Sequence, residues 1–300
     1  MNLKKQIKWQ IRKFLIDHYP KMIIDHEWPA QFGHRVNWDS PRDANEKMQW
    51  LICYSDTSEW TRLADKYRVR EFIKERGLEH LLVPLYGAWK KAEDIDFDSL
   101  PDKFVLKCNH DSASTKIIDK KKGYDKAQLV SFYNQRLKQK YGYLNCEPHY
   151  NKIPPLVIAE QFLEQENNEF HSVSDYKFWC FDGRVYYVSV MFDRTQENVN
   201  ETVYDLDWNP HPEFLESYGH YTSDGRVLPK PQNFDEMLEI VKTLSKGFPM
   251  VRTDLYEVNG KIYFGEMTFT STAGRMGYVD SFLKELGGYV VLPKKRCPIR

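Results

Sequence analysis

Two turn signals in the second half of the chain restrict it to a fold that contains antiparallel strands. Asn259-Gly260 separates two strand-like runs, 250–258 and 261–264, and an Asn-Gly pair in such a place is the strongest short hairpin signal. Asp182-Gly183 interrupts the alternating segment 175–190 in the same way. Both patterns favour an α+β fold over a doubly wound parallel sheet.

Short strands and amphipathic helices are predicted for much of the remaining chain. Asn233 is expected to cap a helix, with Glu236 at the capping-box position. Residues 210–232 contain four prolines and no periodicity, which predicts an irregular excursion. The other predictions are a helical lead-in over 46–77 closed by Gly77, a helix over 125–140, and strands over 81–85, 103–107 and 156–162.

Composition excludes several classes of protein. Lys plus Arg (43) equal Asp plus Glu (43), so no overall positive field attracts nucleic acid, and we expect no nucleic-acid partner. The five cysteines are scattered and form no CxxC pair, which argues against a disulfide framework or a zinc site. A cytoplasmic protein fits these features best.

The N-terminal 20 residues predict an amphipathic helix rather than a signal peptide or a membrane span, because Lys8, Gln10 and Arg12 interrupt its apolar residues. Ile7, Ile11, Phe14 and Leu15 share one face, opposite the basic residues. Two interpretations fit this pattern. The more common use of such a helix is to pack on the protein body, and the alternative is peripheral contact with the inner face of a membrane.

The last predicted hairpin carries candidate metal ligands. Arg252 and Asp254 lie two residues apart and therefore on one face of a strand, and Glu266 leaves the partner strand near Asp254. Two carboxylates suit Mg²⁺, which takes its other ligands from water and phosphate. The same spacing also fits a cross-strand ion pair with no ligand. Ser271 and Gly274 in the polar segment that follows could offer a hydroxyl and backbone N–H groups to an oxyanion.

Lys107 ends the predicted strand KFVLK and precedes a loop of small polar residues, 108–115. A lysine beside such a loop suits phosphate binding, although by itself the pattern is more often an ordinary exposed lysine before a serine-rich turn. Neither G-x-G-x-x-G nor G-x-x-x-x-G-K-[ST] occurs in the sequence. A nucleotide would therefore have to be held without the two commonest phosphate loops.

Several segments, in their order and spacing, resemble the TupA-like branch of the ATP-grasp superfamily from about Phe32 to Leu286. They are FGHRVNWDSPRDANEKMQWL, LADKYRVREFIKERG, LLVPLYGAW, DKFVLKCNH, LVIAEQFLE, DYKFWCFDGRVYYV and FPMVRTDLYEVNGKIYFGEMTFTSTAG. The resemblance implies two antiparallel α+β lobes that clasp ATP. Residues 1–62 would form a helical N-terminal region, 63–160 the first lobe and 161–300 the second.

The resemblance also implies a role for each matching position. ATP would be bound by Lys66, Lys107, Lys177, the loop residues Asn109, His110, Ser112 and Ser114, and the hinge residues Glu160, Gln161, Phe162, Leu163 and Glu164. Mg²⁺ would be held by Asp254, Glu266 and Thr268, and catalysis would involve Arg252 and Lys177. Two features depart from the superfamily pattern: Glu266-Met267-Thr268 replaces ExN, and the phosphate loop lacks glycines.

The activity implied is ATP-dependent ligation of a carboxylate to an amine through an acyl phosphate. The TupA-like branch suggests that an amino acid or another amine is joined to a uronic acid of a bacterial surface polysaccharide. Candidate substrate residues are Asp193, Arg194, Asp207, Trp208, Ser271 and Gly274. Two alternatives stay open: a glycosyltransferase with Asp205-Leu206-Asp207 as its metal motif, which follows no clear apolar strand, and a binding module without catalysis.

Overall fold

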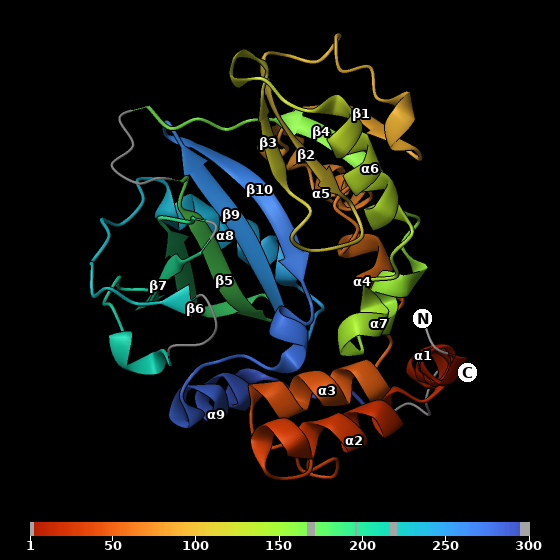
Figure 1. Cartoon of the computed structure of the whole chain (residues 1–300). Coiled ribbons are helices and arrows are strands. Elements are labelled where there is room, and N and C mark those ends of the chain that lie inside the picture. Colours follow the sequence, from red (N-terminus) through yellow and green to blue (C-terminus); the bar gives the residue numbers. More distant parts are fainter. Residues whose placement is uncertain (1–2, 167–171, 196, 217–220, 295–300) are drawn as a thin grey trace. The chain divides into compact units, whose positions relative to one another are not determined.

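The computed structural model describes residues 3–166, 172–195, 197–216 and 221–294 (Figure 1). The chain divides into two compact units. One is Ser58–Glu164, and the other combines Met1–Thr57 with Gln165–Arg300. The N-terminal helices therefore group with the C-terminal half of the chain.

The unit Ser58–Glu164 is built on a four-stranded antiparallel sheet. Its elements are α4 (Ser58–Leu63), α5 (Val69–Glu75), η1 (Glu79–Leu81), β1 (Leu85–Trp89), η2 (Ala92–Asp94), β2 (Lys103–Cys108), β3 (Lys116–Asp119), η3 (Lys120–Lys122), α6 (Lys126–Leu137), α7 (Gly142–Asn145), η4 (Pro148–Lys152) and β4 (Val157–Gln161). The strand order is β1-β4-β2-β3. Leu129 and Tyr133 of α6 share a buried core with Phe104 and Leu106 of β2.

The second unit is built on a six-stranded sheet in the order β10-β9-β5-β6-β7-β8, in which β7 and β8 are parallel. Its elements are α1 (Leu3–His18), α2 (Pro20–Phe32), α3 (Ala44–Tyr54), β5 (Asp175–Phe181), β6 (Arg184–Phe192), β7 (Val199–Asp205), η5 (Pro212–Phe214), β8 (Tyr221–Thr222), α8 (Phe234–Ser245), β9 (Val251–Val258), β10 (Lys261–Thr268), η6 (Ser271–Gly274) and α9 (Asp280–Tyr289). Two largely antiparallel sheets with flanking helices confirm the predicted α+β fold.

Both predicted hairpins are confirmed. β5 and β6 pair across Asp182-Gly183, and β9 and β10 pair across Asn259-Gly260. All four turn residues have positive φ, between 50° and 77°, as a two-residue type I′ turn requires.

Some local predictions were wrong. The run 81–85 is not a strand, because Leu81 is buried in a 3₁₀ turn and β1 begins only at Leu85. A short apolar run by itself does not distinguish these cases. The lead-in 46–77 is helical, as predicted, and Gly77 follows its last helix with φ of 73°, but it consists of three separate helices. Ser55 ends the first by donating its hydroxyl to the Leu51 carbonyl (2.6 Å). The capping box of α8 does not form, since the Asn233 side chain donates to Glu257 instead (2.7 Å).

Helix α8 covers one face of the six-stranded sheet (Figure 1). That face is apolar and includes Phe178, Val188 and Leu255, and α8 presents Met237, Ile240, Val241 and Leu244 as its buried side chains. Because side chains alternate along a strand, the residues between these positions point to the opposite face. Charged side chains gather there.

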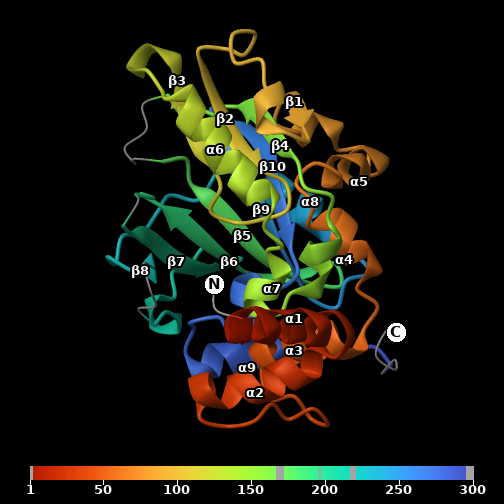
Figure 2. The ribbon, with the colours of Figure 1, turned by 45° about the vertical axis from the view of Figure 1, so that its right-hand side comes forward.

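Helix α1, the red helix at the N-terminus in Figures 1 and 2, does not use its apolar stripe for packing. Leu3, Ile7, Ile11 and Phe14 are more than half exposed, and Ile16 is the buried residue of the helix. The helix does pack on the protein body, as one interpretation expected, but through the side that carries Ile16 and Arg12, and most of its predicted apolar face is exposed. Among the described helices, none combines the length and the apolar character needed to cross a bilayer.

Candidate functional site

A row of charged side chains crosses three neighbouring strands on the face opposite α8. The strand register pairs Lys177 of β5 with Asp254 of β9, and Asp254 with Glu266 of β10. The next row joins Arg252 of β9 to Thr268 of β10. Arg252, Asp254 and Glu266 were placed together by the sequence, and Thr268 and Lys177 only by the resemblance. All five side chains lie on neighbouring strands of one face.

A bulge at Gly265 creates this register. Strict alternation from the Asn259-Gly260 turn would place Gly265 opposite Asp254 and would turn Glu266 to the apolar face. The pairing shifts between Phe264 and Glu266, so Glu266 comes opposite Asp254. A Cβ on Gly265 would meet the Asp254 carbonyl oxygen and the Tyr256 ring at 3.0 Å each, so glycine suits this close approach.

Arg252 connects the row to the segment after β10. Its guanidinium donates from Nε to Oδ1 of Asp254 and from Nη2 to Oδ2, both at 2.8 Å, in the forked geometry of a strong ion pair. It also donates to Glu266 (3.2 Å) and to the Ser271 hydroxyl (2.7 Å). Burial opposes the charge of Arg252, but the carboxylates of Asp254 and Glu266 raise its pKa above the usual value.

Lys177 is held between two carboxylates. Its ammonium donates to Asp175 and to Asp254, and it is almost fully buried. Burial lowers the pKa of Lys177, but the two carboxylates outweigh that effect and raise it. Burial raises the pKa of Asp175. Lys177 is therefore a fixed positive charge in the site.

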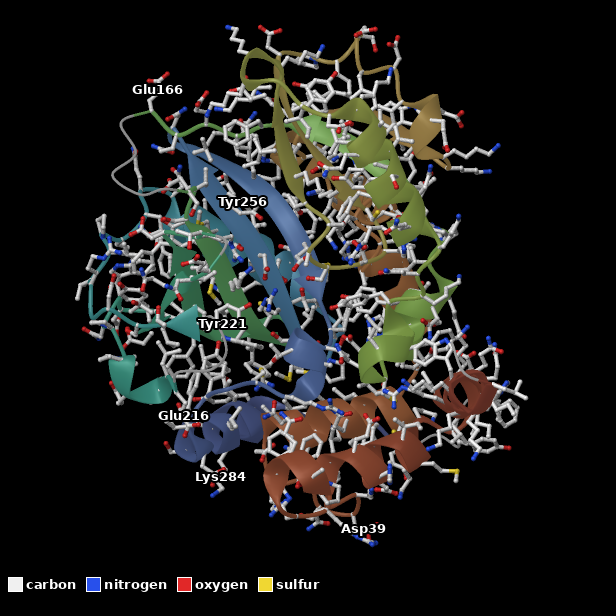
Figure 3. All side chains as sticks on the ribbon, viewed as in Figure 1. Asp39, Glu166, Glu216, Tyr221, Tyr256 and Lys284 are labelled. Carbon is white, nitrogen blue, oxygen red and sulfur yellow. The ribbon has the colours of Figure 1, made fainter. Side chains whose placement is uncertain are left out.

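Besides Asp175, sequence reasoning missed Tyr278, Glu201, Ser189 and Tyr256 on this face. Tyr278 donates to Glu201 (2.7 Å) and lies 3.0 Å from the Ser189 hydroxyl, which pairs through the strand register with Lys177. Burial raises the pKa of Glu201. Tyr256, labelled in Figure 3, lies opposite Asp175 on β9, and the Asp175 carboxylate raises its pKa well above the ordinary value. No alternation in 199–205 indicates Glu201, because Val199 and Val203, which share its side of the strand, are apolar and buried.

A strained turn follows β10. Thr272, Ala273 and Gly274 all have positive φ, of 46°, 55° and 69°. This conformation is costly for a β-branched residue such as Thr272. Gln49 of α3 holds the turn by donating to the Ala273 carbonyl (2.8 Å). Ser271, at the start of the turn, accepts a hydrogen bond from Arg252, so the turn is tied to the charged row.

In the unit Ser58–Glu164, the predicted strand lysine is already paired. Lys107 of β2 forms an ion pair with Glu160 of the neighbouring strand β4, and Arg70 lies 3.6 Å from the same carboxylate. Lys66 donates to the Asp111 carbonyl (2.7 Å), which fixes it beside the predicted phosphate loop. Both lysines are positioned at the loop, and their contact with phosphate stays a prediction.

The side chains of that loop are largely used for internal contacts. Asn109 is buried, donates to Asp65 (2.8 Å) and accepts from the Leu156 amide (2.7 Å). His110 is buried too, and burial lowers its pKa. The Ser114 hydroxyl donates to Asp111, whereas Ser112 is exposed. Any phosphate contact of this loop therefore falls to Ser112 and to backbone groups, with the other side chains holding its shape.

The predicted hinge follows β4. Glu160 and Gln161 are strand residues, and the Gln161 amide donates to the Pro84 carbonyl (2.9 Å). Lys103 holds the residues after them, pairing with Glu164 (2.6 Å) and lying 4.0 Å above the Phe162 ring. Leu163 is half-buried. The structure gives these side chains positioning contacts and leaves their role toward adenine a prediction.

The structure separates the predicted substrate residues. Arg194 lies at the charged row, 4.0 Å from the Asp175 carboxylate, and is exposed. Asp193 pairs with Arg226, and Asp207 is exposed beyond the end of β7. Trp208 stacks on Tyr204 at 4.3 Å and packs against Phe234 of α8, so it belongs to the apolar face and does not offer a sugar platform at the row.

The donor atoms of the row fit Mg²⁺. Three carboxylates (Asp175, Asp254 and Glu266) lie beside the cations Lys177 and Arg252, and Arg194 lies 4.0 Å from Asp175. Glu266 is also the most exposed member of the row. Mg²⁺ takes most of its ligands from water and phosphate, so a few carboxylate oxygens can hold it. Among the described residues, no three or more His, Cys, Asp or Glu side chains group together as a metal site.

Known proteins share features with this chain. A family model described as TupA-like ATPgrasp matches residues 46–291. The structure resembles D-alanine–D-alanine ligase from Bacillus anthracis in complex with ATP, with 17% identity, a TM-score of 0.44, and coverage of 79% of this chain and 64% of that one. The corresponding ligase from Helicobacter pylori has 11% identity and a TM-score of 0.44, with coverage of 85% of this chain and 68% of that one. Phosphoribosylamine–glycine ligase from Thermotoga maritima has 14% identity and a TM-score of 0.39, with coverage of 72% of this chain and 50% of that one.

These structural similarities are too distant to establish an activity. The chain spans less than two thirds of the length of the first of these ligases. None of the curated proteins is similar enough in sequence to count as a match. The family model covers most of the chain, including every strand of the two sheets and helix α9. The chain therefore belongs to the TupA-like ATP-grasp family.

Proposed function

We propose that this protein uses ATP to activate a carboxylate as an acyl phosphate, which an amine then captures to form an amide. The observation that carries the proposal is the row Lys177–Asp254–Glu266 with the Arg252 fork beside it, in a chain of the ATP-grasp family. Such a row combines fixed positive charge with carboxylates, which suits a reaction among anions.

The proposed reaction has two steps. A carboxylate oxygen of the substrate attacks the γ-phosphorus of ATP, the bond to the β,γ-bridging oxygen breaks, and ADP leaves. The amine nitrogen then attacks the acyl carbon, and the tetrahedral intermediate expels phosphate while the nitrogen loses a proton. Lys177 and Arg252 would offset the negative charge that accumulates in both steps.

Asp254 and Glu266 would hold Mg²⁺, with the Thr268 hydroxyl beside Glu266 (3.1 Å). Magnesium, when bound, neutralises phosphate charge and aligns the phosphoryl group for transfer. Arg252 already fixes both carboxylates, so it orients the ligands as well as supplying charge.

For the substrates, we propose a uronic acid of a bacterial surface polysaccharide as the carboxylate and an amino acid or a similar amine as the nucleophile. Family membership supports the polysaccharide. Arg194 supports a carboxylate partner, because it is exposed beside the row and a guanidinium binds a carboxylate through two hydrogen bonds.

A trapping assay tests the activity. The protein is incubated with MgATP, hydroxylamine and a panel of uronic-acid sugars, and ADP and hydroxamate are both measured. We expect the two products in equal amounts with at least one sugar, because hydroxylamine captures an acyl phosphate directly. Tight binding of MgATP with no ADP on any acceptor would instead support a binding module without catalysis.

The same assay separates the glycosyltransferase alternative, which would release UDP from a UDP-sugar without consuming ATP. Contrary to the expectation from sequence, the Asp205-Leu206-Asp207 candidate does follow a strand, since β7 ends at Asp205. Asp205, however, accepts hydrogen bonds from the Asn209 amide (2.8 Å) and side chain (2.9 Å). It therefore shapes a turn, which gives no support to a metal motif.

A further inference from the structure

Helix α1 presents an apolar stripe to solvent. The exposed fractions of Leu3, Ile7, Ile11 and Phe14 are 69%, 51%, 53% and 56%. At 3.6 residues per turn, these four positions fall within about 80° of the helix circumference. Isolated exposed apolar residues are common, but a continuous stripe marks a surface that another body covers.

The opposite side of α1 attaches it to the rest of its unit. Ile16 is fully buried and lies on the far side of the helix from the stripe. On that same far side, Arg12 forms an ion pair with Glu27 of α2. The stripe therefore faces outward because the helix is anchored through its other side.

The charge of α1 indicates what covers the stripe. The helix contains five basic residues, Lys4, Lys5, Lys8, Arg12 and Lys13, and one acidic residue, Asp17. A second copy of this helix would bring like charges together, whereas anionic lipid headgroups would complement them. The ring of Phe14 lies 4.8 Å from His18 and 6.0 Å from Tyr19, which adds aromatic side chains suited to the boundary between lipid and water.

We propose that α1 lies in the surface of an anionic membrane, with Leu3, Ile7, Ile11 and Phe14 inserted among the acyl chains and its lysines at the headgroups. The helix has the features of an interfacial anchor, with an apolar stripe on one side and basic residues around it. Anchoring of this kind would hold the charged row in the same protein near membrane-bound acceptors.

Vesicle flotation with the full chain tests the proposal. Vesicles of phosphatidylcholine alone are compared with vesicles of equal parts phosphatidylcholine and phosphatidylglycerol. We expect flotation with the anionic vesicles only, and weaker flotation at high salt. Ile7→Ser/Ile11→Ser should lower the bound-to-free ratio by about tenfold or more, because less apolar surface is buried. Lys5→Glu/Lys8→Glu should lower it similarly through charge.

Matched controls change residues of the same type elsewhere. Ile117 and Val227 are 58% and 63% exposed, so Ile117→Ser/Val227→Ser removes comparable apolar surface away from α1 and should float like the unmodified protein. Lys121→Glu/Lys122→Glu is the control for charge. The proposal fails if the unmodified protein does not float, if it floats equally with neutral vesicles, or if the variants in α1 and the controls behave alike. The proposal also fails if the unmodified protein is a dimer in solution and Ile7→Ser/Ile11→Ser makes it a monomer, because a second copy of the chain would then cover the stripe.

Discussion

Glu266 of β10 lies opposite Asp254 of β9, and one Arg252 guanidinium donates to both carboxylates. The two acids differ in access: the Asp254 side chain is buried, and that of Glu266 is about one third exposed. Asp254 is thus fixed by its cationic neighbours, and Glu266 is the member that a ligand from solvent can reach.

Glu266→Gln should strongly reduce turnover and leave the fold intact. The change is nearly isosteric but removes a charge from the proposed magnesium site, and the loss of metal-assisted charge stabilisation is expected to slow ADP release about 100-fold or more. Glu239→Gln on α8, which changes an exposed carboxylate, is the control. Unchanged ADP and hydroxamate formation by Glu266→Gln would remove Glu266 from the mechanism.

Gly265→Ala should disturb the register of the acid pair. Its Cβ would approach the Asp254 carbonyl oxygen to 3.0 Å, so the bulge must shift or open. We expect a loss of about 1 kcal/mol or more in the free energy of unfolding and a weaker dependence of activity on Mg²⁺. Gly288→Ala on α9 is the control, because a Cβ there meets nothing within 4 Å. If Gly265→Ala and Gly288→Ala have the same free energy of unfolding and the same Mg²⁺ dependence, glycine is not needed at position 265 for the register of the acid pair.

Lys177→Met should destabilise the fold strongly, because Asp175 and Asp254 would keep buried charge without their shared counter-ion. Breaking a buried ion pair from one side costs about 3 kcal/mol or more in the free energy of unfolding. Adding Asp175→Asn should recover part of this loss, as urea unfolding of the single and double variants would measure. Lys284→Met, in an exposed pair with Asp280, should cost at most about 0.5 kcal/mol. If the losses in free energy of unfolding caused by Lys177→Met and Asp175→Asn simply add in the double variant, the two residues are not coupled.

Thr272→Gly should stabilise the protein. Thr272 has φ of 46° and ψ of 35°, a left-handed conformation that glycine adopts without strain. We expect a gain of about 1 kcal/mol in the free energy of unfolding. Thr115→Gly is the control, since its φ is not positive and glycine there should only add disorder to the unfolded chain. A loss of stability with Thr272→Gly would show that the threonine side chain makes a necessary contact.

His149 should make the unit Ser58–Glu164 sensitive to acid. Burial lowers the pKa of His149 to about 3, and its Nε2 finds no hydrogen-bond partner among the described residues. Because the folded pKa lies below the unfolded value of about 6.5, the folded state is favoured fully above that value and less as the pH falls toward the folded pKa.

The expected size is about 2 kcal/mol lost between about pH 7.5 and about pH 5, measured by urea unfolding. His149→Phe should remove the part of this pH dependence that His149 contributes and leave the part due to buried His110, whose pKa burial also lowers. His80→Phe, at an exposed histidine, should leave it in place. The assignment is wrong if both variants keep the pH dependence of the unmodified protein.

The sequence by itself determined the local geometry of the hairpins and the identity of the candidate ligands. Asn259-Gly260 and Asp182-Gly183 fix their turns because few residues accept positive φ, and the two-residue spacing of Arg252 and Asp254 places them on one face. Apolar periodicity likewise indicated α6 and α8. These features depend on neighbours in sequence, which is why they could be read from it.

The tertiary structure decided how the side chains of the site meet. The sequence placed Glu266 near Asp254, and a one-residue bulge at Gly265 brings it directly opposite Asp254 on the same face. Glu201 and Asp175 reach the site only because β5, β6 and β7 are ordered beside β9 in the sheet. The outward stripe of α1 depends on which side of the helix meets α2. Long-range pairing of strands and helices sets these contacts, and a single sequence carries little information about it.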